Sequence, residues 1–393
     1  MGAATLLVAN GCSLILGLTP NSAGDAGEDG SVSPGDARHD VHARADAHPA
    51  HDAHMASKDA APVRDAGVDA YICCTCNGGT EIDAGCLRQL AADAAYPITL
   101  AVDSTRVYWA NYAVPPSAGT VVAIVKAPGG VAVTLASGQN HPLRLVVDSD
   151  NAYWTDIGVQ TSTPGGTVDM NGAVVKVPLA GGGPVTLAAN LTTDPYGIAV
   201  GDGFVFWTNY LVPVALDRVP IDGGAPMTIP YNGSGSTAIA VAGGNLYWVA
   251  AGGGVWTVPV AGGTPLGLGG APVNPTAIAV GSNGFVYWLT PGSPDAGGTV
   301  EGLATPFVDG GVPTRLETSA NPGYPFAIAV DDTNVYWTEF YGNRVMKMPL
   351  GGGLPTTILE RPDASNPAGL AVDGTSVYWT EYSAGRVMML TPE

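Results

Sequence analysis

The chain has 393 residues, of which 12% are charged, and it contains 55 glycines and 32 prolines at a net charge of −19. This acidity argues against nucleic acid and anionic membrane surfaces as partners, because phosphate binding depends on clustered Lys and Arg. The glycine and proline content favours many short strands and turns over helices.

Residues 1–20, "MGAATLLVANGCSLILGLTP", form an apolar segment that Asn10 and Gly11 interrupt. It is too short to span a bilayer, which takes about 20 apolar residues. The run "LLVANGC" resembles the cleavage site of bacterial lipoproteins, where small residues precede a cysteine that becomes lipidated. The resemblance implies lipidation of Cys12, and therefore an exported protein anchored by lipid to the bacterial cell envelope or outer surface.

Residues 21–70 are rich in Ala, Asp, Gly and His and contain few large apolar side chains, so we expect a disordered linker that acts as a tether. Imidazoles and carboxylates at this density make a weak candidate site for zinc, nickel or copper. We favour a solvated spacer, since a disordered chain offers a metal no preformed geometry. The histidines are His39, His42, His48, His51 and His54.

A cysteine-rich segment follows at residues 71–86, "YICCTCNGGTEIDAGC". Four thiols so close together suit either a zinc site or two disulfides. The usual pair of Cys-x-x-Cys knuckles is missing, and an exported protein favours disulfides, whose connectivity stays open. The cysteines are Cys73, Cys74, Cys76 and Cys86.

From residue 97 onward one phrase recurs seven times, as in "IAVDDTNVYWTEF". Its tryptophans lie 40 to 53 residues apart, near the period of four-stranded propeller blades. Each copy contains an apolar run, a turn and a "VYW"-like run, and most continue with a third run, a glycine pair and a fourth run. The tryptophans are Trp109, Trp154, Trp207, Trp248, Trp288, Trp337 and Trp379.

The seventh copy ends after its third run, and residues 86–92 match the pattern of a fourth run. We therefore predict an all-β fold over residues 86–393: a seven-bladed β-propeller of four-stranded blades, with an N-terminal strand closing the last blade. Closure of this kind removes two exposed sheet edges. The "VYW" runs are apolar on both faces, as expected of blades packed between neighbours.

The sequence "YWTD" occurs at residues 153–156, and "YWTE" at residues 336–339 and 378–381. This pattern resembles the YWTD propellers of the low-density lipoprotein receptor type, the class B repeats. The resemblance implies a propeller that binds partners. The family has six blades, whereas seven copies occur here.

The connections between second and third runs vary most in length, so we expect the binding surface on the face that they share with the fourth-to-first connections. Aromatic and acidic side chains there suit sugars, cationic groups or peptides, while contacts between blades are the structural alternative for the acids. The candidate binding residues are Asn111, Tyr112, Asp156, Asn209, Tyr210, Glu339, Phe340, Tyr341, Glu381 and Tyr382.

These features predict a monomeric binding or interaction module for an extracellular ligand: a glycan, a peptide or a protein. A propeller lyase or hydrolase is the alternative, because seven-bladed lyases that inactivate cyclic antibiotics resemble this architecture. One observation argues against an enzyme. The repeats contain a single histidine, His141, so a histidine-centred acid–base pair would need an unconventional partner. The sequence predicts no cofactor and no catalytic residue, and turn formation explains Asp103, Asp148, Asp331 and Asp373 without a cation.

Overall fold

A computed structural model describes residues 71–72, 80–82, 85–112, 118–158, 160–162, 168–191, 193–210, 215–231, 235–250, 252–268, 275–293, 297–304, 314–318 and 323–392. These residues form strands and turns, with no helix among them. Outside them lie the lipoprotein-like segment with Cys12, the linker with His39, His42, His48, His51 and His54, and Cys73, Cys74 and Cys76, so the predictions for these residues stay predictions.

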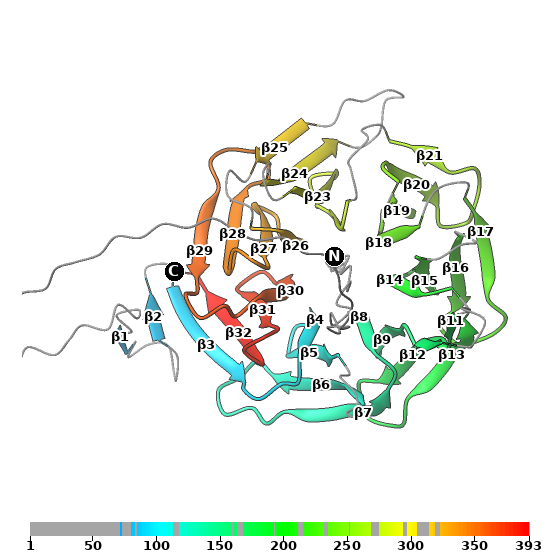
Figure 1. The fold of residues 1–393 in the computed structure, drawn as a ribbon, viewed down its shortest axis with the longest axis horizontal. Coiled ribbons are helices and arrows are strands. Elements are labelled where there is room, and N and C mark those ends of the chain that lie inside the picture. The colour runs from blue at the N-terminus through cyan, green and yellow to red at the C-terminus, as the bar shows by residue number, and fades with distance from the viewer. Residues whose placement is uncertain are drawn as a thin grey trace, which may run out of the picture. The chain divides into compact units, whose positions relative to one another are not determined.

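The strands form seven antiparallel blades arranged in a ring, as the sequence predicts (Figure 1). Blade 1 contains β4 (Pro97–Val102), β5 (Arg106–Asn111), β6 (Gly119–Val125) and β7 (Val133–Gln139). Blade 2 contains β8 (Pro142–Val147), β9 (Asn151–Asp156), β12 (Gly172–Pro178) and β13 (Val185–Leu191). Blade 3 contains β14 (Pro195–Gly201), β15 (Phe204–Asn209), β16 (Ala215–Pro220) and β17 (Met227–Pro230).

Blades 4 to 6 repeat this order. Blade 4 contains β18 (Ser236–Ala242), β19 (Asn245–Ala250), β20 (Val255–Pro259) and β21 (Leu266–Gly267). Blade 5 contains β22 (Ala277–Val280), β23 (Phe285–Ser293), β24 (Gly297–Ala304) and β25 (Thr314–Thr318). Blade 6 contains β26 (Pro325–Val330), β27 (Asn334–Glu339), β28 (Arg344–Pro349) and β29 (Thr356–Glu360).

Blade 7 joins the two ends of the propeller. Its first three strands are β30 (Pro367–Val372), β31 (Val377–Glu381) and β32 (Arg386–Thr391), and its fourth is β3 (Gly85–Ala91). Leu87 lies opposite Leu390 in this pairing, which confirms that the N-terminal strand closes the last blade. The sequence did not predict that β2 (Thr80–Ile82) and β1 (Tyr71–Ile72) extend the sheet beyond β3.

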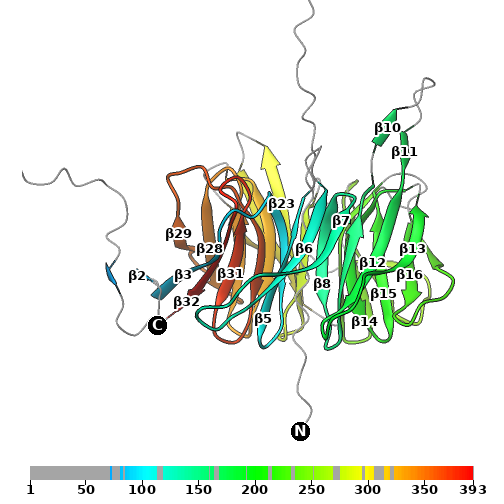
Figure 2. The same cartoon turned by 90° about the horizontal axis from the view of Figure 1, so that it is seen from below.

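A hairpin of β10 (Gln160–Ser162) and β11 (Val168–Met170) fills part of the long second-to-third connection of blade 2. It stands out from one face of the ring (Figure 2). In blades 3 and 6, tight hairpins join the third and fourth strands, and Gly224 and Gly353 there adopt φ of 139° and 140°. Glycine takes such angles without steric cost, so the glycine pairs serve as predicted.

The core lies between blades and explains why the tyrosine–tryptophan pair recurs. Consecutive side chains of a strand point to opposite faces, so each pair supplies one ring to each neighbouring interface. Tyr108 of blade 1 and Trp154 of blade 2 pack in one cluster, and Tyr153 and Trp207 pack in the next. All seven repeat tryptophans are at most 2% exposed. Truncating one to alanine should cost about 3–5 kcal/mol of folding free energy.

The turn between first and second strands gives the repeated aspartate its role. In blade 1, Asp103 Oδ1 accepts hydrogen bonds from the backbone N–H groups of Thr105 and Arg106, at 2.6 and 2.7 Å. The Tyr108 hydroxyl donates to Asp103 Oδ2 at 2.5 Å. The same hydroxyl-to-carboxylate bond recurs in blades 2, 6 and 7, as Tyr153 to Asp148, Tyr336 to Asp331 and Tyr378 to Asp373. These aspartates therefore hold turns and tyrosines.

Candidate functional site

Backbone hydrogen bonds show which connections share a face. In five blades, the residue after the second strand donates its N–H to the carbonyl of a residue just before the first strand. Both sets of connections therefore lie on one face, called here the mouth face, as the sequence predicts. The pairs are Tyr112 with Tyr96, Ile157 with His141, Tyr210 with Asp194, Phe340 with Tyr324, and Tyr382 with Asn366.

Aromatic side chains from blades 6, 7, 1 and 2 gather on the mouth face. Ring centroids lie 5.9 Å apart for Phe340 and Tyr382, 5.2 Å for Tyr382 and Tyr96, and 5.1 Å for Phe340 and Tyr341. The Tyr112 ring lies 4.9 Å from that of His141 in the next blade, with the two ring planes tilted by 49°. We call these six residues, Tyr96, Tyr112, His141, Phe340, Tyr341 and Tyr382, the aromatic arc.

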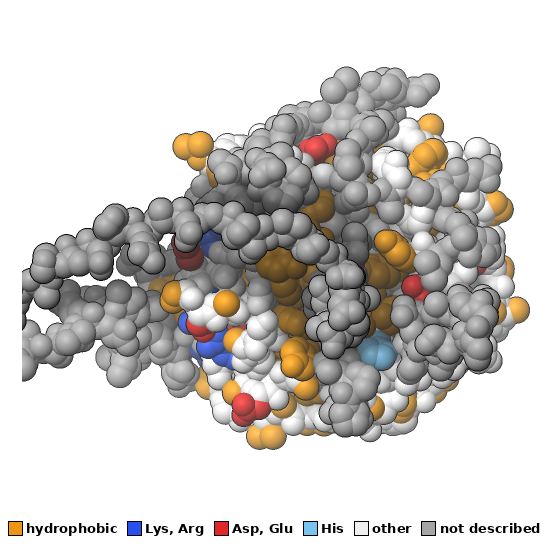
Figure 3. All heavy atoms as spheres, viewed as in Figure 1, with side chains coloured by type: hydrophobic (Ala, Val, Ile, Leu, Met, Phe, Trp, Pro, Cys, Tyr) orange, Lys and Arg blue, Asp and Glu red, His pale blue; other side chains and the backbone are white. Residues whose placement is uncertain are grey.

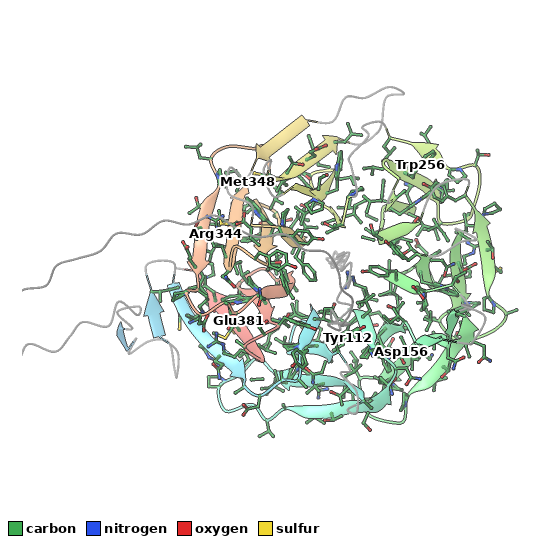
Figure 4. All side chains as sticks on the ribbon, in the orientation of Figure 1. Tyr112, Asp156, Trp256, Arg344, Met348 and Glu381 are labelled. Atoms are coloured by element: carbon green, nitrogen blue, oxygen red, sulfur yellow. The ribbon has the colours of Figure 1, made fainter. Side chains whose placement is uncertain are left out.

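Tyr112 lies toward the centre of the ring (Figure 4). The pKa of Tyr112 is raised to about 12, mainly because the side chain is buried. Smaller contributions in the same direction come from Tyr382, Tyr196 and Asp194. Figure 3 looks onto this face, and hydrophobic side chains, a class that there includes tyrosine, gather around its centre.

Two of the six arc residues, Tyr96 and His141, were not among the binding residues predicted from the sequence. Tyr96 and His141 precede the first strands of blades 1 and 2 with φ of 57° and 61°, as Tyr324 does in blade 6 with φ of 52°. Positive φ is unusual for a tyrosine and costs of order 1–3 kcal/mol, a strain that tends to occur at functional sites. A sequence signal exists, because a residue followed by proline precedes the first apolar run in six of the seven copies.

The predicted acids lie inside the blades. Glu339 is 1% exposed, and its Oε2 accepts hydrogen bonds from Arg344 Nε at 2.8 Å and Nη2 at 2.5 Å. Glu381 is fully buried, binds Arg386, and pairs with Arg361 at 3.2 Å across the junction of blades 6 and 7. These two carboxylates therefore make structural contacts, the alternative to ligand binding that was weighed above.

Asn111, Asn209 and Phe340 are also buried, at 9%, 2% and 8% exposure. Asn209 Nδ2 donates to Asp217 at 2.6 Å, and Asn111 Nδ2 donates to Thr120 at 2.9 Å. The structure therefore leaves the half-buried Tyr112, Tyr210 and Tyr382, and Tyr341 at 65% exposure, as the predicted residues that reach the surface.

Asp156 differs from the other repeat acids because it lacks a cationic partner. It lies opposite Ala173, whereas Glu339 lies opposite Arg344 at the same register position. It is 5% exposed, and Oδ1 has no hydrogen-bond partner. Burial raises its pKa to about 7, against the opposing effect of hydrogen bonds from Asn140 and Trp154.

His141 is half-buried, with Nδ1 3.0 Å from the carbonyl oxygen of Gly158. Within the described part of the chain it forms no salt bridge with a carboxylate. The same part contains no group of three or more His, Cys, Asp or Glu side chains suited to hold a metal ion. It also contains no helix of the length and hydropathy needed to cross a membrane. Cys86 is disulfide-bonded, and the pairing of the four cysteines stays a prediction.

No family model matches the chain, and no curated protein matches it in sequence. Solved structures do share the fold. A streptogramin B lyase is 13% identical with a TM-score of 0.63, covering 78% of this chain and 97% of that chain. Catalytically inactive virginiamycin B lyase from Staphylococcus aureus with quinupristin is 16% identical with a TM-score of 0.62, covering 78% and 99%.

The WD40 β-propeller domain of Doa1 is 11% identical with a TM-score of 0.60, covering 79% of this chain and 98% of that chain. These structures include lyases and a propeller of another repeat type. At such identities the similarity shows the β-propeller fold alone, since one fold supports many functions.

Proposed function

We propose that the protein is a surface-tethered binding module whose propeller takes an extracellular ligand on the aromatic arc. The arc is the observation that carries this proposal. Tyrosines offer flat apolar faces and a hydroxyl, which suits ligands that are apolar on one side and polar on the other. The lipoprotein-like Cys12 and the linker at residues 21–70 support tethering.

The arc is also preorganised, which favours binding. Its rings contact one another, and the backbone bonds of the mouth face hold both sets of connections. Little side-chain entropy is then lost when a ligand binds, so even a modest contact area gives measurable affinity.

The test uses a glycan array and a peptidoglycan pull-down with the propeller. The variant carries Tyr112→Ala, Tyr341→Ala and Tyr382→Ala, leaving out Phe340 because that ring is core. We expect it to lose about tenfold or more in affinity for any ligand found, because rigid aromatic contacts dominate such surfaces. The melting temperature should fall only slightly.

The matched control changes exposed apolar residues on the hairpins that join third and fourth strands. Val131 and Leu354 are 78% and 89% exposed, and alanine at both should leave binding intact. Unchanged binding by the folded triple variant would contradict the proposed site.

A lyase is the second candidate, favoured by His141 beside Tyr112 and by the fold shared with streptogramin B and virginiamycin B lyases. A screen of lyase and esterase substrates would compare wild type with His141→Ala. Activity that is present in wild type and absent from the variant would replace the binding module by an enzyme. No activity in wild type would leave the binding module as the proposal.

A further inference from the structure

One aligned position near the start of the seven first strands follows a rule, and blade 2 breaks it. Small residues fill this position elsewhere because the next blade lies against it. A Cβ on Gly197 would lie 2.9 Å from Ala238 Cα, and one on Gly369 would lie 2.7 Å from Leu100 N. In chain order the position holds Thr99, Arg144, Gly197, Ala238, Ala277, Ala327 and Gly369.

Arg144 is 1% exposed and keeps most of its hydrogen-bonding capacity unused. Nη1 donates to the carbonyl of Leu143 at 3.1 Å, while Nε and Nη2 are buried without a partner. No carboxylate among the described residues forms a salt bridge with it. A guanidinium does not lose its proton in a protein, so this site contains a buried positive charge that has no counter-ion in the described part of the chain.

Six other basic side chains of the propeller are used differently. Arg88, Arg106 and Lys176 each donate to a backbone carbonyl of the neighbouring blade, and Arg344, Arg361 and Arg386 pair with carboxylates. The contrast with Arg344 is the most informative. Arg344 holds Glu339 through Nε and Nη2, the same edge that Arg144 leaves unpaired. This edge binds a carboxylate through two parallel hydrogen bonds.

Arg144 also lies beside aromatic side chains of the mouth face. Its guanidinium carbon is 5.3 Å from the centre of the Tyr196 ring, which lies 5.4 Å from that of Tyr210. His141 of the aromatic arc directly precedes the strand that carries Arg144, three residues before it. The unpaired charge therefore adjoins the aromatic arc.

We infer that Arg144 binds the carboxylate of an acidic carbohydrate whose sugar rings pack on the tyrosines of the mouth face. This inference rests on the proposed binding function and names its ligand class. The charge specifies an anion, and the planar unpaired edge fits a carboxylate. Tyrosine faces and hydroxyls match the apolar faces and hydroxyl edges of sugars. Because Nε and Nη2 have no exposed surface, binding includes a shift of Arg144 or of the neighbouring tyrosine rings.

The test compares an oligogalacturonate with its methyl ester of equal length, because the ester keeps the sugars and removes the charge. Calorimetric titration of the wild-type propeller should give about tenfold or tighter affinity for the acid. Arg144→Met keeps the length of the side chain without its charge, so it should bind both probes equally. Lys347→Met removes one positive charge from the third strand of blade 6 and should keep the preference.

Thermal unfolding separates a binding role from a structural one. An unpaired buried charge destabilises the fold, so Arg144→Met should melt at or above the wild-type temperature. A fall of more than about 5 °C would show that the guanidinium stabilises the fold, and it would overturn the inference.

The binding results separate this inference from the proposed function. Equal affinity of wild type for acid and ester, or a glycan array with only neutral hits, would overturn the acidic ligand and leave the binding module. Absence of binding to both probes would overturn the inference as well, and the array would then decide whether the mouth binds any glycan.

Discussion

At the scale of single residues, identical positions in the repeat have different chemistry because their partners differ. The acid after the tryptophan is an ion-paired core residue where the third strand supplies arginine, as for Glu339 and Arg344. Where the third strand supplies Ala173, Asp156 has no cation and its pKa rises to about 7. The residue that faces it on the neighbouring strand thus decides whether a buried repeat acid has a cationic partner.

This difference predicts how stability depends on pH. Asp156 ionises near pH 3.8 when unfolded and near pH 7 when folded, so the folded state binds more protons between these values. Its contribution to stability is present below about pH 4 and is lost as the pH rises toward 7. The melting temperature should fall over that range, and Asp156→Asn should reduce the fall.

The exposed Asp150 supplies the control, since Asp150→Asn should leave the pH profile as it is. Burial also raises the pKa of Asp194, to about 6, so a smaller slope of the same sign should remain in Asp156→Asn. A profile of Asp156→Asn that overlays the wild type would contradict the assignment.

At the scale of elements, the short strand β3 closes the last blade and with it the ring. It pairs with β32 along five residue positions and supplies the outer strand of the last blade. A Cβ on Gly85 would lie 2.2 Å from the Thr391 carbonyl oxygen, so the strand also approaches the C-terminal strand closely. Without β3, the outer edge of β32 would have no partner, and unpaired edges favour aggregation.

Two truncations test this role. A chain that starts at residue 71 keeps β1, β2 and β3, and it should unfold cooperatively. A chain that starts at residue 93 lacks all three, and it should aggregate or lose cooperative unfolding. Calorimetry and size-exclusion chromatography measure both properties. Equal melting of the two chains would refute the closure argument.

At the scale of the whole molecule, the ring brings residues far apart in the sequence into one surface. Tyr96 and Tyr382 come from opposite ends of the propeller and lie 5.2 Å apart. The aromatic arc therefore forms only when the ring is closed. If the molecule is tethered as proposed, binding and closure are both needed for it to act at the cell surface.

The tether has its own test. Cys12→Ser should move the full-length protein from the membrane fraction to the soluble fraction, because the sulfur that accepts lipid is gone. Wild type should incorporate a radioactive fatty acid, while Ser22→Ala in the linker should leave both properties unchanged. Wild type that takes up no label would refute lipidation of Cys12.

The sequence by itself determined the number of blades, the order of their strands and the closure by the N-terminal strand. These properties are encoded locally, in the alternation of "VYW", the turn aspartates and the glycine pairs, and each is repeated. Only the tertiary structure decided that Glu339 and Glu381 are buried, that His141 meets Tyr112 and that Nε and Nη2 of Arg144 have no hydrogen-bond partner among the described residues. The reason is that exposure and pairing depend on side chains from other strands and blades, which one copy of the repeat does not specify.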